Sequence, residues 1–356
     1  MIINANALHL PIADNTVQCV VTSPPYYGLR SYGIGTENGE IGLEPTPDEY
    51  VAKMVQVFRE VKRVLKDDGV LWLNLGDSYA GGGGASGHTS ETTNFGRKTE
   101  SYGAVKTGGN TYGVKAKDLL GIPWMVAFAL RADGWYLRSD IIWSKPNPMP
   151  ESVKDRPTKA HEYVFLLSKS QKYYYDAEAI FEVANYDGRK DTQYKGGNKD
   201  VSCFEHERWA NKIRGFKTKD QLPDNQHHGA DILSSRKQDN TGNPTYTGFN
   251  DRYRDNHPDG LPARNKRSVW TINTQPFKGA HFAVMPEKLV EPCVLAGSRV
   301  GDVILDPFAG SGTVGVVAQK LGRAFIGVEL NPEYVKLAEA RLIATPVALP
   351  MGVIWN

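Results

Sequence analysis

Residues 303–313 read VILDPFAGSGT, an apolar run followed by an acid, an aromatic residue and a cluster of small residues. The next residues, 314–322 (VGVVAQKLG), are compatible with a helix. A strand, a glycine-rich turn and a helix N-terminus in this order form a cradle for a nucleotide cofactor. The stretch therefore predicts an α/β fold that binds such a cofactor.

A second predicted strand, residues 324–328, ends in Glu329, which lies 23 residues after Asp306. A carboxylate about 20 residues after the glycine turn is where such folds hold the ribose hydroxyls of a nucleotide. The turn itself, Gly310-Ser311-Gly312, lacks the full dinucleotide fingerprint and the Lys-Ser/Thr pair of a P-loop. These residues therefore predict a nucleotide-like cofactor without identifying it.

A second informative stretch, residues 20–28, reads VVTSPPYYG. Pro24 and Pro25 have no N–H and a fixed φ, so they end strand pairing and leave the carbonyls of Ser23 and Pro24 available to a ligand. Tyr26 adds a flat face on which a base can stack. The stretch suits a planar heterocycle that carries an exocyclic amine, although a surface turn at the end of a strand would also fit these residues.

Together, TSPPY and DPFAGSGT resemble the DNA amino-methyltransferases, which transfer a methyl group from S-adenosylmethionine to the exocyclic nitrogen of cytosine or adenine. The catalytic stretch precedes the cofactor loop, an order that resembles the circularly permuted β group of the family. The resemblance covers residues 1–176 and about 269–342. It implies a Rossmann-like α/β methyltransferase fold with a mostly parallel sheet, helices on both faces and a target-recognition insertion.

The resemblance also implies how the chain is divided. Residues 1–180 would form the catalytic part, residues 181–267 the target-recognition insertion and residues 268–356 the S-adenosylmethionine-binding part of the same domain. Within the first part, residues 81–113 are rich in Gly, Ser and Thr, which predicts a flexible loop. That loop is either a plain surface loop or one that closes over DNA.

The resemblance implies catalytic roles for Ser23, Pro24, Pro25 and Tyr26. Asp306 and the loop after it would hold the methionine part of the cofactor, and Glu329 would hold its ribose. The N-terminal segment would line the adenine, and the segment before a predicted helix would flank the methionine part. The cofactor residues expected in this way are Asn6, Ala7, His281, Phe282, Ala283, Pro286, Asp306, Pro307, Phe308, Ala309, Gly310, Ser311, Gly312, Thr313, Glu329 and Asn331.

The predicted insertion is rich in the side chains that read base edges and hold phosphates. A poorly ordered linker would have a similar composition. Lys145, from a loop outside the insertion, could contact a phosphate or the base, or it could be a solvated lysine. The candidate DNA contacts are Lys145, Arg252, Arg254, Arg264, Lys266 and Arg267.

The mechanism follows from the chemistry of an exocyclic amine, whose lone pair is conjugated into its ring. We expect Ser23 and the Pro24 carbonyl to accept its hydrogens while Tyr26 stacks on the base, so that the methyl is attacked in line. The nucleotide must first be flipped out of the duplex, at a cost of a few kcal/mol. Ser at position 23 is found mostly in the cytosine enzymes of the family, so N4 of cytosine is favoured, with N6 of adenine as the alternative.

The three cysteines, Cys19, Cys203 and Cys293, show no CxxC spacing, and Cys293 is interpreted as a core residue. No spacing around the histidines supports a metal site. The net charge of +2 requires any DNA-binding surface to be a local patch. No segment approaches a membrane span, and the scattered cysteines fit a reducing cytoplasm. With the resemblance, this implies a cytoplasmic protein encoded by a prokaryote or a phage.

The expected partner is double-stranded DNA, with a homodimer and a separate cognate restriction endonuclease as further candidates. Two other classes stay open: a methyltransferase that acts on RNA or a protein amide, and a silent DNA-binding relative. Local signals predict a helix from Pro47 to Gly69, a buried strand over residues 70–75 and the start of another strand at residues 173–175.

Overall fold

The computed structural model describes residues 1–29, 34–35, 39–80, 115–183, 263–275 and 284–346. Its internal contacts divide the chain into a larger unit, Met1–Ile180 with Asn265–Asn356, and a smaller unit, Phe181–Arg264. In the smaller unit the short strands β6 (Glu182–Val183) and β7 (Ala263–Arg264) pair antiparallel. The larger unit carries the elements that follow.

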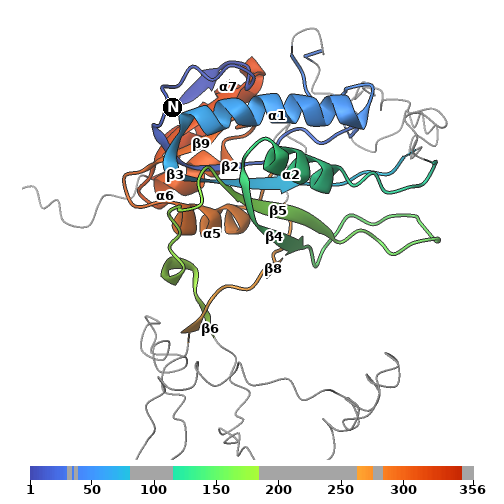
Figure 1. Cartoon of the computed structure of the whole chain (residues 1–356). Coiled ribbons are helices and arrows are strands. Elements are labelled where there is room, and N and C mark those ends of the chain that lie inside the picture. Colours follow the sequence, from blue (N-terminus) through green and yellow to red (C-terminus); the bar gives the residue numbers. More distant parts are fainter. Residues whose placement is uncertain (30–33, 36–38, 81–114, 184–262, 276–283, 347–356) are drawn as a thin grey trace, which may run out of the picture. The chain divides into compact units, whose positions relative to one another are not determined.

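The larger unit is built on one twisted sheet (Figure 1). Strand β5 runs antiparallel to its neighbours β3 and β4, and the other neighbouring strands run parallel. A mostly parallel sheet is therefore observed, as predicted. The strands, in spatial order, are β1 (Ile2–Asn4), β10 (Ala324–Glu329), β9 (Val303–Asp306), β2 (Val17–Thr22), β3 (Leu65–Leu75), β5 (His161–Ser168), β4 (Tyr136–Ser144) and β8 (Val269–Thr271).

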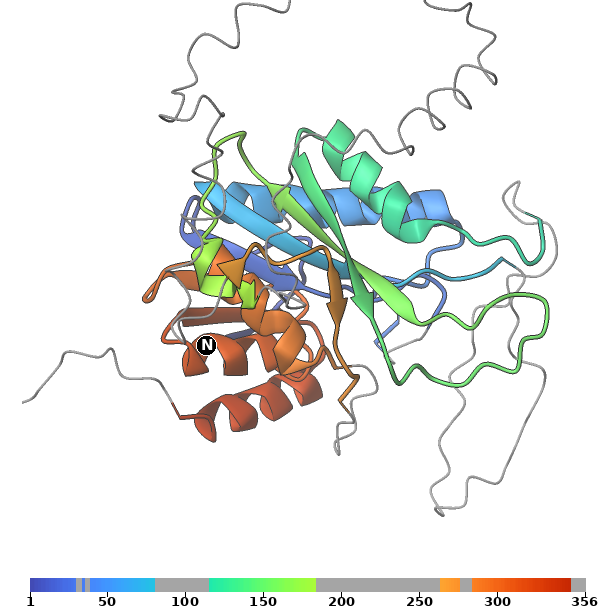
Figure 2. The same cartoon turned by 90° about the horizontal axis from the view of Figure 1, so that it is seen from below.

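Helices cover both faces of this sheet, which confirms the predicted layers (Figure 1). Helices α1 (Pro47–Val64) and α2 (Ile122–Ala132) pack on one face. Helices α5 (Glu287–Gly297), α6 (Thr313–Lys320) and α7 (Pro332–Ile343) contribute to the core of the other. Figure 2 shows these three orange and red helices grouped at one end of the sheet. No helix among the described ranges is both long and apolar enough to cross a membrane.

Two local predictions need correction. Helix α1 ends at Val64, five residues before Gly69, because β3 begins at Leu65. Gly69 instead lies where the register of β3 against β2 shifts, and a Cβ there would come within 2.9 Å of the Lys66 carbonyl oxygen. Residues 173–175 form no strand; the ring of Tyr174 lies under the guanidinium of Arg299 instead.

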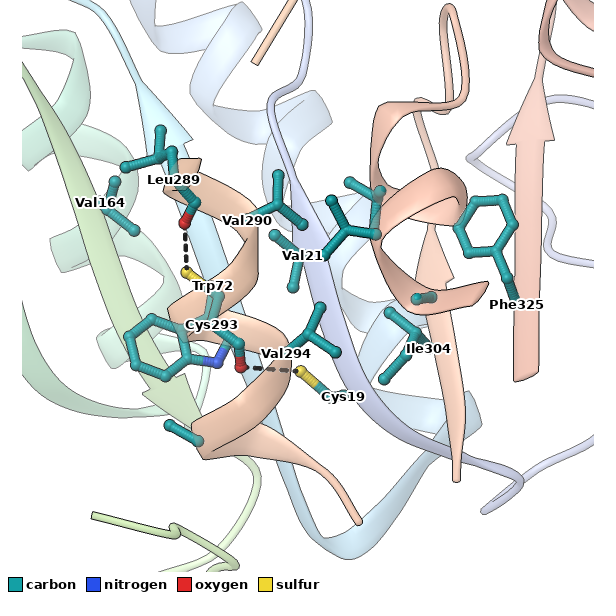
Figure 3. Packing of buried hydrophobic residues seen from close by; sticks show 14 of the residues in the cluster. Cys19, Val21, Trp72, Val164, Leu289, Val290, Cys293, Val294, Ile304 and Phe325 are labelled. Carbon is teal, nitrogen blue, oxygen red and sulfur yellow. Dashed lines mark hydrogen bonds between the residues drawn. The ribbon is translucent and has the colours of Figure 1, made fainter. Parts of the chain in front are cut away.

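Both cysteines of the described ranges lie in the core between α5, which carries Cys293, and β2, which carries Cys19 (Figure 3). The thiol of Cys293 donates to the carbonyl of Leu289 at 3.3 Å, and Cys19 Sγ lies 3.8 Å from the carbonyl oxygen of Cys293. Burial raises the pKa of both thiols above the usual range. The two side chains are therefore neutral core groups, and neither is presented as a nucleophile.

Strands β2 and β9 are neighbours in the sheet, with Val20 opposite Leu305. Because they run parallel, their carboxyl ends meet at the same edge. The segment TSPPY leaves β2 at this edge, and the segment DPFAGSGT leaves β9 there. Two motifs that lie 284 residues apart in the chain are thus brought together, and Thr22 Oγ1 donates to Asp306 Oδ1 at 2.7 Å.

Candidate active site

A cavity of about 640 Å³ lies at this edge of the sheet. Parallel α/β sheets bind ligands at the carboxyl ends of their strands, which makes this cavity the candidate active site. Residues of both motifs line it, together with residues that follow β1 and residues that follow β4. The residues of the sequence analysis that line the cavity are Asn6, Ala7, Ser23, Pro24, Pro25, Tyr26, Lys145, Asp306, Pro307, Phe308, Ala309, Gly310, Ser311, Thr313 and Glu329.

The carboxylate of Asp306 is buried at the end of β9, with 3% of its surface exposed. One of its oxygens, Oδ1, accepts hydrogen bonds from Thr22 Oγ1 and from the main-chain N–H of Phe308 at 3.0 Å. Burial outweighs these bonds and, with the nearby charge of Glu329, raises the pKa of Asp306 to about 7. A cationic ligand group next to this carboxylate would favour its ionised form.

Glu329, at the end of β10, holds the glycine loop. Its Oε2 accepts the main-chain N–H of Gly310 at 2.8 Å, and its Oε1 accepts that of Asn331 at 2.8 Å. Burial raises the pKa of Glu329 despite these bonds. Gly310 and Gly312 have φ values of +50° and +76°, a region that glycine adopts without steric cost. Two carboxylates therefore face the loop that the sequence singles out.

The loop after β2, which also lines the cavity, is anchored by residues distant in sequence. The hydroxyl of Tyr50, on α1, donates to the carbonyl of Pro25 at 2.8 Å. Gly76, just after β3, packs against the ring of Tyr26, because a Cβ at Gly76 would come 2.5 Å from Tyr26 Cε2. The ring position thus depends on the absence of a side chain at residue 76.

The phenol of Tyr26 is the centre of a polar network formed by Ser23, Tyr26, Asn74, Lys145 and Glu162, which we call the Tyr26 network. Tyr26 donates to Glu162 Oε2 at 2.8 Å and accepts from Asn74 Nδ2 at 2.6 Å. Ser23 Oγ lies 3.2 Å from the same phenol oxygen. Burial and the carboxylate of Glu162 raise the pKa of Tyr26 well above its usual value. The phenol therefore stays protonated at neutral pH.

Lys145 points into the cavity, with 17% of its side chain exposed. Its ammonium forms an ion pair with Glu162 Oε1 and lies 4.3 Å from the centre of the Trp143 ring. A lysine in this position faces whatever occupies the cavity. This burial does not fit a solvated loop lysine, and contact with the base or with a phosphate stays a prediction.

Asn74 and Glu162 are site residues that the sequence analysis missed. Each carried a visible signal: Asn74 is the one polar residue in the apolar run VLWLNL, and Glu162 opens the apolar strand EYVFLLS. Asn74 is 2% exposed, and its Oδ1 has no hydrogen-bond partner within the described ranges. Burying a polar atom without a hydrogen-bond partner costs free energy, so such a group in an otherwise apolar strand is a sign of a functional site.

Several predicted residues do not line the cavity. Gly312 and Asn331 shape the loop and the start of α7, and Pro286 caps the N-terminus of α5. Among the DNA candidates, Arg264 pairs with Glu182 in the smaller unit, whereas Lys266 lies over the ring of Trp270 in the larger unit. Arg267 does not line the cavity either. Other predictions concern residues outside the described ranges: His281, Phe282, Ala283, Arg252, Arg254, the loop 81–113 and residues 184–262 of the insertion.

Known proteins resemble the whole chain. A family model described as DNA methylase matches residues 17–340. The Type II methyltransferase M.SmaI of Serratia marcescens is 44% identical over 325 residues, covering 91% of this chain and 84% of that protein. The Type II methyltransferase M.Cfr9I of Citrobacter freundii is 41% identical over 331 residues, covering 93% and 83%. The solved PvuII DNA methyltransferase (cytosine-N4-specific) shares the fold, with a TM-score of 0.54 and 17% identity over 99% of this chain and 87% of that one.

Proposed function

The chain belongs to the DNA methylase family, and from that premise we propose that it methylates the N4 amine of a flipped cytosine in duplex DNA. The family places it among the S-adenosylmethionine-dependent enzymes that methylate cytosine N4 or adenine N6. The predicted enzyme class and cofactor are thereby confirmed. The choice of cytosine, and the roles of individual residues, belong to the proposal.

One observation carries the proposal: a single cavity joins the TSPPY loop to the loop around Asp306 and Glu329. Ser23, Pro24 and the two carboxylates all line it. A methyl donor held by the carboxylates can therefore face an amine held by Ser23 and Pro24. This proximity turns a reaction between two separate molecules into a local one, which is a major source of rate acceleration.

The residues around the glycine loop fit the cofactor. S-adenosylmethionine supplies a methyl group on a positively charged sulfur, and its methionine part also carries an ammonium. We assign Asp306 and the loop 307–313 to the methionine part and Glu329 to the ribose. The raised pKa of Asp306 supports this, because a cation beside that carboxylate would offset the cost of burying its charge.

On the other side, Ser23 and the carbonyl of Pro24 accept the hydrogens of the target amine. Two acceptors on the amine draw its lone pair out of conjugation and aim it at the methyl carbon. Tyr26 stacks on the base, with its ring held between Gly76 and the Tyr26 network. The buried Cys19 and Cys293 support direct transfer without a covalent enzyme intermediate.

Cytosine is proposed over adenine because Ser23 directly precedes the two prolines of TSPPY, where the cytosine enzymes of the family mostly carry serine. A serine hydroxyl both donates and accepts, so it can bond the amine and the neighbouring ring nitrogen of the base. The solved relative of the same fold is a cytosine-N4-specific enzyme, which agrees with this choice. Adenine N6 is the alternative that the same chemistry would serve.

DNA recognition belongs, in this proposal, to residues 181–267, which lie between the two motifs in the chain. Lysine, arginine and amide side chains are abundant there, as base-edge and phosphate contacts require. The relatives M.SmaI and M.Cfr9I are Type II methyltransferases. We therefore propose that this enzyme acts in a restriction-modification system beside a separate endonuclease.

Product analysis tests the function directly. The protein is incubated with unmethylated duplex DNA and S-adenosylmethionine, and the DNA is digested to nucleosides for mass spectrometry. We expect N4-methylcytosine. N6-methyladenine would overturn the choice of base and keep the family chemistry, and the absence of either product with cofactor bound would contradict the proposed substrate.

A further inference from the structure

We infer that Glu162 is the final acceptor of the proton that the target amine loses during methyl transfer, and that the proton reaches it through Ser23 and Tyr26. This inference rests on the proposed placement of the amine against Ser23 and Pro24. It does not depend on whether the base is cytosine or adenine, because either amine loses one proton. It concerns residues, Glu162 and Asn74, to which the sequence motifs assign no role.

The hydrogen bonds form a chain in one direction. Ser23 Oγ lies 3.2 Å from the phenol oxygen of Tyr26, and that phenol donates to Glu162 Oε2 at 2.8 Å. Both distances are within hydrogen-bonding range for hydroxyl groups, the second being near the ideal. A carboxylate accepts only, so it must stand at the receiving end of the chain.

Asn74 sets the direction of this chain. Its Nδ2 donates to the phenol oxygen at 2.6 Å and also lies 3.0 Å from Glu162 Oε2. An amide nitrogen can only donate, so the phenol must direct its own hydrogen elsewhere, toward Glu162. With Ser23 and Asn74 both donating to it, the phenol oxygen uses its two lone pairs and its one hydrogen. The hydrogen bonds are therefore aligned for proton transfer from Ser23 through the phenol to Glu162.

The charged groups around Glu162 suit a proton acceptor. Lys145, just after β4, pairs with its other oxygen, and both side chains are largely buried, at 17% and 15% exposure. Lys159 also faces Glu162 and Asp77, and burial lowers the pKa of this lysine. Among the described residues, Tyr26 is the remaining titratable side chain that hydrogen-bonds Glu162, and its raised pKa keeps it a proton donor.

The step balances as follows. The amine nitrogen forms a bond to the methyl carbon as the carbon–sulfur bond breaks, with its electron pair left on sulfur. The nitrogen, now positively charged, gives its proton to Ser23 Oγ, whose own proton moves to the Tyr26 oxygen. The phenol proton moves to Glu162 Oε2, so the products are a neutral methylated amine and a neutral glutamic acid. Water takes the proton from Glu162 when the base leaves.

The test compares Glu162→Gln and Tyr26→Phe with the wild type in single-turnover methylation of a long unmethylated duplex from pH 5.5 to 9, with the cofactor saturating at every pH. The glutamine keeps the size and polarity of residue 162 but is no base, and the phenylalanine keeps the stacking ring but breaks the chain. We expect either variant to transfer methyl about 10²-fold more slowly at neutral pH. The wild-type rate should decrease as the pH is lowered, and neither variant should show this decrease.

Further measurements separate a proton acceptor from a merely structural residue. Cofactor affinity, measured by calorimetry, and the melting temperature should stay at wild-type values in Glu162→Gln. Lys145→Met should move the acid fall of the rate to higher pH, because it removes the positive charge beside the carboxylate. Glu178→Gln, the same change at an exposed glutamate outside the cavity, should behave as the wild type.

A folded Glu162→Gln protein with the wild-type rate and pH profile would overturn the inference. So would a pH profile that keeps its acid fall in both variants, whatever the absolute rate. Nucleoside analysis of the wild-type product is independent of these outcomes. Methylated adenine there would change the proposed base and leave the proton chain as stated.

Discussion

The loop after β9 and the loop after β2 leave neighbouring strands at the same edge of the sheet, but different parts of the chain hold them. The loop after β9 is bonded by Asp306, at the end of β9 itself, and by Glu329, at the end of the neighbouring strand β10. The loop after β2 is held by Tyr50 on α1, Gly76 after β3 and Glu162 on β5. One loop is thus shaped locally, whereas the other is shaped by residues from across the fold.

Because the two loops are held differently, mutations near each of them should have different effects on the enzyme. A change near the glycine loop should act on cofactor affinity, because the loop and its carboxylates are assigned to the cofactor. A change around the TSPPY loop should act on methyl transfer and leave cofactor affinity as it is. Each of the following predictions either sharpens this division or breaks it.

The largest effect is expected from Tyr26→Ala. It removes the stacking face and the middle of the Tyr26 network together, so methyl transfer should fall by about 10³-fold or more. Cofactor affinity, measured by calorimetry, should not change. Tyr136→Ala, at an exposed tyrosine on β4, is the control and should leave both quantities unchanged. Lost cofactor binding in a folded Tyr26→Ala protein would contradict the division between the two loops.

Gly76→Ala should have the next largest effect, although residue 76 touches neither the base nor the cofactor in our proposal. The new methyl group would push the ring of Tyr26 from its position, since the contact would be 2.5 Å. A shift of about 1 Å can lower a rate by roughly 10²-fold, which is the loss we expect in single-turnover methylation. Val300→Ala, at an exposed residue that does not line the cavity, is the control and should keep the wild-type rate. Full activity in Gly76→Ala would show that the ring can move without cost.

Asp306 predicts a pH effect on the cofactor side. Cofactor affinity should weaken below about pH 7 by about tenfold for each pH unit, because binding a cation then requires the carboxyl to lose its proton. Asp306→Asn should bind more weakly at pH 8 and show no such dependence. Titration calorimetry from pH 5.5 to 8.5 measures this, with Asp67→Asn, at an exposed residue, as the control. A wild-type affinity independent of pH would remove Asp306 from the cofactor contact.

The same group affects the stability of the protein without cofactor. The pKa of Asp306 is raised from 3.8 to about 7, so between these values the folded protein binds a proton that the unfolded chain does not. The free energy of unfolding contributed by this group therefore falls as the pH rises from about 4 to 7. Asp306→Asn should flatten that part of a urea-denaturation profile against pH.

The smallest effect on activity is expected from Cys293→Ala. The thiol is 1% exposed and packs in the core, so its loss should lower the free energy of unfolding by about 1 kcal/mol through poorer packing. Methyl transfer should not change, because no step uses the thiol. Denaturant titration and single-turnover methylation check the two statements. A large loss of transfer in a stably folded variant would point to a covalent route.

Much of the molecule could be predicted from local sequence. The glycine loop of residues 310–312, the carboxylate at Glu329 and the proline stop after β2 each depend on residues close together in the chain. The layered α/β fold also follows from strand and helix patterns with the two motifs. Local patterns did less well at element ends: α1 stops at Val64 instead of Gly69, because pairing of Leu65 with β2 outweighs the helical spacing.

The sequence by itself determined the family motifs, their order and the residues that shape the cofactor loop, because short-range geometry and residue chemistry are sufficient for these. Only the tertiary structure decided which side chains complete the site. Asn74 and Glu162 lie 48 and 136 residues from Tyr26 in the chain, yet both bond its phenol. No local pattern encodes such distances, since the order of β2, β3 and β5 in the sheet is what brings the three side chains together.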